Sequence, residues 1–238
     1  MEPARQIHRE ERVTSTVRRS SAELALIVVG VLLAFGLEAW WSGQSEARAM
    51  TESLRAITVE FETADSVLGW LEARHRENIE QFTALSQLLG TGRLDSAEDS
   101  VLRLSEPLWR NQNFAPTMPA YAQFLAGDGL SNLDHESLRD ALFEYEQRLE
   151  TNRVWDDYVR TSMVMSWEPT LSSRIPAGNL AENVPEALRL MTTPQLLAAD
   201  LEFRNLIELR IVTERGLLTR RESLRAAVRD VLQILRSY

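Results

Sequence analysis

The sequence contains no cysteine and no lysine, and it has few glycines, prolines and aromatic residues. The absence of cysteine excludes disulfide frameworks, thiolate catalysis and cysteine-ligated zinc or iron–sulfur centres. All 26 basic residues are arginine, which indicates a GC-rich genome rather than a binding function. Ten glycines, eight prolines and 7% aromatics in 238 residues argue against a sandwich or barrel with many tight turns. The composition predicts an all-α protein.

Motifs that carry catalytic chemistry are also missing. The sequence has no G-x-S-x-G, no H-E-x-x-H, no Walker-type glycine loop and no dinucleotide fingerprint. The three histidines, His8, His75 and His135, are too scattered to form a metal site by spacing. We therefore expect a protein that is not an enzyme, with no catalytic, cofactor-binding or metal-binding residues.

The net charge of −9 is distributed unevenly along the chain. Residues 1–21 carry five Arg and three Glu, a charge of +2, whereas residues 42–238 carry 21 Arg and 30 acidic residues, a charge of −9. Phosphate contacts need a positive surface, so the acidic part is poorly suited to bind DNA or RNA. We expect no nucleic acid partner.

Residues 22–41 read AELALIVVGVLLAFGLEAWW and predict one transmembrane helix. At a rise of about 1.5 Å per residue this stretch spans roughly 30 Å, the thickness of the hydrocarbon core of a bilayer. Arg18 and Arg19 precede it, and Trp40 and Trp41 end it with side chains that favour the membrane interface. A cleaved signal peptide is the alternative, because the unbroken apolar core covers only the 14 residues Leu24–Leu37. The tryptophan pair directly after the core favours a retained anchor.

The arginines before the span predict its orientation. Positive residues stay on the cytoplasmic side, so residues 1–21 form a basic cytoplasmic tail and residues 42–238 form a periplasmic helical bundle. This arrangement is that of a single-pass protein of the bacterial inner membrane. Gly30, Ala34 and Gly36 provide a small-residue face on which the span could pack against another helix.

A coiled-coil-like seam follows the span, so the transmembrane helix is expected to continue into a long stalk helix. Its positions alternate in steps of four and three up to the Gly90-Thr91-Gly92 stop: Met50, Leu54, Ile57, Phe61, Ala64, Leu68, Leu71, His75, Asn78, Phe82, Leu85 and Leu89. His75 and Asn78 are its only polar members. They are either a ligand-binding or pH-sensing point, or else a polar pair that sets the helix register or a satisfied core contact, and we favour the structural interpretation.

Two further long helices complete the predicted bundle. One starts near Asp134 and stops before Pro169; the other starts at Thr193-Pro194 and runs to the C-terminus. The last helix is basic near its end, whereas the stalk is acidic. Pairing between these two helices is the interpretation that we favour over contact with lipid phosphates or an acidic partner.

The segment Glu23–Trp41 resembles the membrane segment of a family of uncharacterised bacterial single-pass proteins, with the pattern E-[IL]-x-L-I-V-x-G-V-L-[IL]-A. A weaker resemblance covers Thr117–Gln147, where a short helix and a glycine-containing turn precede a long helix. The resemblance implies a membrane anchor with an extracytoplasmic helical domain. It supplies no catalytic residues.

Two functions agree with these features. In the first, the chain is a non-catalytic accessory or scaffold subunit of a larger membrane complex, for example a respiratory or photosynthetic one. In the second, it is an extracytoplasmic sensor or ligand-binding module that signals through a partner. The expected partners are the lipid bilayer and either other membrane subunits or a second copy of the chain, since heptads do not distinguish these.

Overall fold

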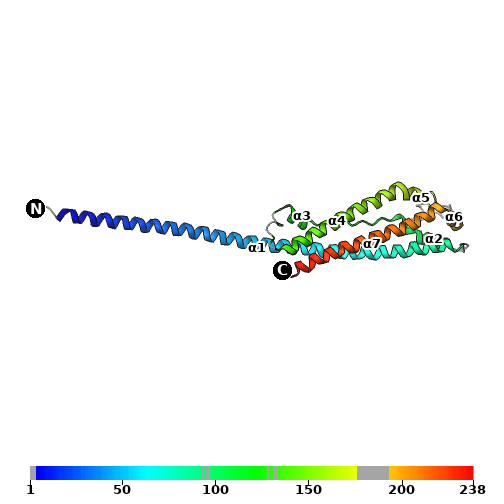
Figure 1. Ribbon diagram of the computed structural model, residues 1–238, viewed down its shortest axis with the longest axis horizontal. Coiled ribbons are helices and arrows are strands. Elements are labelled where there is room, and N and C mark those ends of the chain that lie inside the picture. The colour runs from blue at the N-terminus through cyan, green and yellow to red at the C-terminus, as the bar shows by residue number, and fades with distance from the viewer. Residues whose placement is uncertain are drawn as a thin grey trace. The chain divides into compact units, whose positions relative to one another are not determined.

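The computed structural model describes residues 4–92, 94, 97–127, 129–130, 133, 135–175 and 193–237, and for residues 4–28 it describes the backbone alone. All regular structure within these residues is helical, which confirms the predicted all-α class (Figure 1). The elements are α1 (Ala4–Gly90), α2 (Glu98–Ser105), the 3₁₀ helix η1 (Glu106–Trp109), α3 (Pro119–Ala126), α4 (Glu136–Ser162), the π-helix η2 (Met163–Trp167), α5 (Glu168–Ser172), α6 (Pro194–Ala199) and α7 (Leu201–Leu235).

The chain divides into two compact units, residues 1–54 and residues 55–238. Helix α1 contributes to both, and the other helices belong to the second unit. Among the described residues, no helix combines the length and the apolar character that crossing a membrane requires. The predicted span begins at Ala22, and the side chains of its residues 22–28 lie outside the described part of the chain.

The second unit is built on three long helices: residues 55–90 of α1, α4 and α7 (Figure 1). Asp65 of α1 pairs with Arg225 of α7 at 2.8 Å, whereas Ser86, further along α1, bonds Glu208, earlier in α7, at 2.5 Å. Helix α7 is therefore antiparallel to α1. The rings of Phe61 in α1 and Tyr145 in α4 lie 4.8 Å apart, which brings α4 against α1 as well.

Each long helix buries one heptad-spaced stripe. The predicted seam of α1 is confirmed, since Leu54 and every later seam position through Leu89 are buried, His75 and Asn78 included. Met50 is only partly buried. Helix α7 buries a second stripe with alternating steps of four and three: Phe203, Ile207, Arg210, Glu214, Leu217, Arg221, Leu224, Val228, Val231 and Leu235. This spacing keeps one face of each helix turned toward its neighbours.

The helix ends follow from local chemistry. Helix α1 ends at Gly90, and Gly92 takes the left-handed conformation with φ of +68°, as the predicted Gly-Thr-Gly stop requires. The prediction of one final helix from Thr193 was wrong. Asp200 interrupts it after α6, and its carboxylate accepts the N–H of Phe203 at 3.0 Å to start α7.

The predicted helix stop before Pro169 was also wrong. Pro169 lies in the first turn of α5, a helix position that tolerates proline. The helix reaches α5 through the π-helix η2, which inserts one extra residue. Val159 and Met163 are buried, and the next position in the four–three pattern would be Ser166. The insertion instead turns Trp167 into the core, where it is 3% exposed.

Candidate functional site

The two polar residues of the α1 seam meet a glutamate of α7. The Nδ1 atom of His75 lies 2.6 Å from Oε2 of Glu214, and the amide of Asn78 donates to the same oxygen at 3.3 Å. All three side chains are buried. An ionised carboxylate only accepts hydrogen bonds, so Nδ1 of His75 carries the proton. Its Nε2 atom has no hydrogen-bond partner among the described residues.

Arg210 supplies the charge that balances Glu214. Its Nη2 atom donates to Oε1 of Glu214 at 3.0 Å and to the carbonyl of Arg110 at 3.2 Å. The guanidinium also lies over the ring of Trp167, 4.6 Å from its centroid, and 5.6 Å from that of Phe82. The extra residue of η2 thus places an indole ring against a buried cation.

The charges of this layer reinforce each other. Burial raises the pKa of Glu214, but the hydrogen bond from His75, the charge of Arg210 and the contact with Asn78 outweigh it and hold that pKa below its ordinary value. Burial lowers the pKa of Arg210, and the charge of Glu214 opposes the shift. Glu214 is accordingly a carboxylate at neutral pH, and the pair is ionised.

A second buried layer lies further along α7. Arg221 donates to Oδ1 of Asn152 at 2.8 Å and to Oδ1 of Asp156 at 2.5 Å, joining α7 to α4. It also reaches the carbonyl of Gln112 at 3.5 Å, and the other oxygen of Asp156 accepts the backbone N–H of Phe114 at 3.1 Å. These two layers share one feature: each contacts the backbone between η1 and α3.

We call residues 110–118, which connect η1 to α3, the connecting segment. Because α1 and α4 run in the same direction, the chain must return along the bundle between them, and Figure 1 shows this return path from α2 to α3. Nine residues of extended chain cover about 30 Å, close to twenty residues of helix. At its far end Glu60 caps α3, with its two carboxylate oxygens accepting the N–H groups of Ala120 and Tyr121 at 2.8 and 2.9 Å.

The buried charges therefore have a structural task. An irregular segment has no helical ladder to satisfy its backbone groups, and such groups are costly to bury without partners. Arg210, Arg221 and Asp156 supply those partners from inside the bundle. This arrangement agrees with the favoured interpretation of His75 and Asn78 as a structural polar pair, and it brings them to one layer.

The basic end of α7 pairs with the acidic stalk, as predicted. Arg225 bonds Asp65 and Glu72, Arg229 bonds the same aspartate, and these pairs join α7 to α1. Arg236 contacts Glu62 at 2.9 Å. The hydrogen bonds and charges of Arg225 and Arg229 outweigh burial and lower the pKa of Asp65.

The described part of the predicted span exposes large apolar side chains around the whole helix. Eight of them are exposed between residues 29 and 41: Val29, Val31, Leu32, Leu33, Phe35, Leu37, Trp40 and Trp41. A Cβ atom added at Gly30 or Gly36 would meet nothing within 4 Å, and Ala34 is exposed. The predicted anchors Arg18 and Arg19 have side chains outside the described residues.

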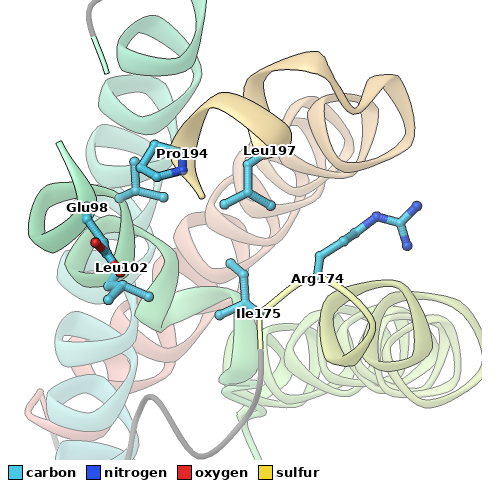
Figure 2. A pocket seen from close by; sticks show the side chains of 7 residues that line it. Glu98, Leu102, Arg174, Ile175, Pro194 and Leu197 are labelled. Atoms are coloured by element: carbon cyan, nitrogen blue, oxygen red, sulfur yellow. The ribbon is translucent and has the colours of Figure 1, made fainter. Parts of the chain in front are cut away.

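Two of the hollows in the second unit differ widely in size. A cavity of about 10 Å³ between α2, α5 and α6 has room for about one water molecule. Figure 2 shows Leu102, Ile175 and Leu197 gathered around it, with the guanidinium of Arg174 directed away. A groove of about 450 Å³ lies between α3 and α4, and it is large enough for a small molecule.

The chemistry of the buried layers is that of ion pairs. No three His, Asp or Glu residues gather as a potential metal site within the described ranges. Reasoning from the sequence missed Arg210, Glu214, Arg221 and Asp156 as members of these layers. A signal was present, because the first three occupy heptad positions of α7 that otherwise carry apolar residues.

No protein-family model, no curated protein and no solved structure matches this chain. The resemblance of Glu23–Trp41 to single-pass membrane proteins therefore stays a prediction.

Proposed function

We propose that this chain is a membrane-anchored, non-catalytic accessory subunit of a larger bacterial membrane complex. Residues 22–41 would be its anchor, residues 1–21 its cytoplasmic tail and residues 42–238 its periplasmic part. The observation that carries the proposal is the exposure of apolar side chains all round α1 between Val29 and Trp41.

This exposure has an energetic consequence. Burying one large apolar side chain contributes roughly 1.5–3 kcal/mol of stability. Eight such side chains here are 47–69% exposed, so in water the helix loses on the order of 10 kcal/mol of the stabilisation that full burial would give. A stripe on one side of the helix could be covered by a single neighbouring helix. Side chains that point in every direction are suited to a lipid environment.

The anchor is tested by membrane fractionation with an alkaline wash. The double substitution Val31→Arg/Leu33→Arg places two charges in the apolar stretch, at about 3 kcal/mol each relative to an apolar residue. We expect the wild-type chain in the washed membrane and the variant in the soluble fraction. The matched control is Leu201→Arg/Val212→Arg on α7, since Leu33 and Leu201 are 69% and 68% exposed. A wild-type chain that washes off the membrane would refute the anchor.

The orientation is tested with single cysteines, for which a chain without cysteine is a clean background. We expect Ser45→Cys, an exposed position after the span, to react with a membrane-impermeant maleimide on spheroplasts. Thr14→Cys should react only after the membrane is permeabilised. The reverse pattern would contradict the proposed topology.

Association with a complex is tested by purifying the tagged chain from its own membranes in mild detergent. We expect stoichiometric co-purification of defined membrane subunits, and its loss in Gly30→Leu/Gly36→Leu, because bulky residues there keep helices apart. Gly43→Leu is the control, since Gly43 lies beyond the predicted span and is equally open. Recovery of the chain alone, or only as a homodimer, would contradict an accessory role.

The second candidate, a periplasmic sensor or ligand-binding module, is favoured by one specific observation. This is the groove between α3 and α4, which is the larger of the two hollows.

A further inference from the structure

Helix α1 carries a second stripe, on the face opposite its buried seam. Its positions also alternate in steps of three and four, and all of them are exposed: Ala56, Val59, Thr63, Ser66, Trp70 and Ala73. We call these six residues the outer stripe. None of them is charged, although 26% of the chain is, and Glu52 and Glu77 occupy the next positions at its two ends. A helix face in contact with water normally carries charged residues, so the outer stripe is unusual for such a face.

Two members of the outer stripe are large apolar side chains. Val59 is 58% exposed and Trp70 is 55% exposed. Tryptophan is enriched among the residues that dominate binding at protein interfaces, and the core of an interface is depleted in charge. The remaining members are Ala, Thr and Ser, whose short side chains leave room for a second helix to approach and for its indole ring to pack between them. The outer stripe therefore has the composition of an interface core.

We propose that the outer stripe pairs with the outer stripe of a second copy of this chain, with the two α1 helices parallel. Apolar and small residues in alternating steps of three and four form the seam of a two-stranded coiled coil. In a parallel pair each seam position lies beside its own counterpart, so Trp70 packs against Trp70 of the second copy, with the small side chains of Ser66 and Ala73 on either side. The result is a symmetric dimer with its two-fold axis along the helices.

Charge complementarity selects the parallel direction. In a parallel pair, Arg55 at one edge of the seam lies beside Glu60 at the edge of the second helix, and symmetry forms this ion pair twice. Arg55 is exposed, and Glu60 is the partly buried carboxylate that caps α3. An antiparallel pair that aligns the two stripes would bring Arg55 near Arg76 instead, and two like charges repel.

The parallel direction also suits the proposed anchor, since both chains then enter the pair at Arg55 from the same end. The outer stripe lies in the second unit, so the pairing itself does not depend on the anchor. A pair of copies is compatible with a larger complex that contains two of them.

The test is disulfide cross-linking of single cysteines in the full-length chain, which has none of its own. In the proposed pair Thr63→Cys faces its counterpart, so that the two Cβ atoms can reach the roughly 4 Å that a disulfide requires. The matched control is Thr151→Cys on α4, because both threonines are exposed and bond the carbonyl four residues earlier at 2.9 Å. On mild oxidation of freshly broken cells, we expect roughly fivefold more covalent dimer from Thr63→Cys than from Thr151→Cys. Equal amounts would overturn the proposal.

The direction of the pair is tested by co-expressing Ala56→Cys and Ala73→Cys chains that carry tags of different size. A parallel pair joins residue 56 to residue 56 and residue 73 to residue 73, whereas an antiparallel pair joins residue 56 of one chain to residue 73 of the other. We expect the two like-with-like dimers. A mixed dimer as the main product would overturn the parallel arrangement.

The role of Trp70 is tested by adding Trp70→Ser to the Thr63→Cys chain. We expect about tenfold less covalent dimer, since the substitution removes the largest side chain of the interface core. The control is Tyr158→Ser on α4, because Tyr158 is an aromatic residue that is 54% exposed and lies outside the outer stripe, and it should leave the dimer unchanged. Thermal melts verify that both variants are folded. An unchanged amount of dimer in the folded Trp70→Ser variant would overturn the proposal.

Discussion

Replacing Glu214 with glutamine should destabilise the bundle by about 3–5 kcal/mol. The substitution keeps the size of the side chain and removes its charge. Arg210 is 1% exposed, so its guanidinium would stay buried with the Arg110 carbonyl and two aromatic rings as its neighbours. A buried charge that loses its counter-ion is among the most destabilising single changes in a protein.

The magnitude is measured by guanidinium unfolding of the full-length protein in detergent, followed by circular dichroism at pH 7. Asp230→Asn is the matched control, because Asp230 is exposed on the same helix, and we expect a change within about 0.5 kcal/mol. The double substitution Arg210→Met/Glu214→Gln should recover most of the loss, since an apolar replacement leaves no unpaired charge. A loss below about 1 kcal/mol for Glu214→Gln would show that water reaches this layer, and our reading of it would be refuted.

Three other predictions concern pH and the connecting segment. The folded-state pKa values of Glu214 and Asp65 lie below their unfolded values, so the stabilisation from these carboxylates is complete above the ordinary carboxyl pKa and is lost as the pH falls through the lowered values. In denaturant unfolding measured from pH 7 to pH 3, we expect the midpoint concentration to decrease once the pH is below about 4, and to decrease less steeply in Glu214→Gln. Glu60→Ala should cost about 1 kcal/mol and speed hydrogen exchange in α3, whose first turn it caps, and unchanged exchange would contradict this. Asp156→Asn should cost about 3 kcal/mol and speed exchange across residues 110–118, whereas a uniform change over the whole bundle would contradict a local role.

The sequence predicted what depends on local periodicity. The α1 seam from Leu54 to Leu89 follows from one heptad pattern, and the end of the helix follows from Gly90-Thr91-Gly92. The pairing of the basic α7 with the acidic α1 could be predicted because charge composition differs between the two segments. The seam and the end of α1 can be predicted from the residues of that segment alone, and the pairing with α7 can be predicted from the net charges of the two segments.

The buried layers could not be predicted in the same way. His75 finds its partner 139 residues later, and nothing in the seam of α1 specifies which residue of α7 lies opposite. The π-helix was missed because its effect, the shift from Ser166 to Trp167, depends on the fit of the indole against Arg210 in the assembled core. The groove depends on how α3 returns to α4, and residues 110–118 have no periodic signal.

The connecting segment also sets an order of events during synthesis. Residue 110 leaves the ribosome 100 residues before Arg210, the side chain that bonds its carbonyl, an interval of about 5–20 seconds at bacterial or slower elongation rates. During that time water must hydrate the carbonyls of the connecting segment that Arg210 and Arg221 bond in the folded bundle. The acidic side chains of α1 and α4 that pair with arginines of α7 also lack these partners. The bundle is therefore completed in one late step, when α7 arrives. Until then the apolar seam of α1 lacks the helix against which it is buried in the folded bundle.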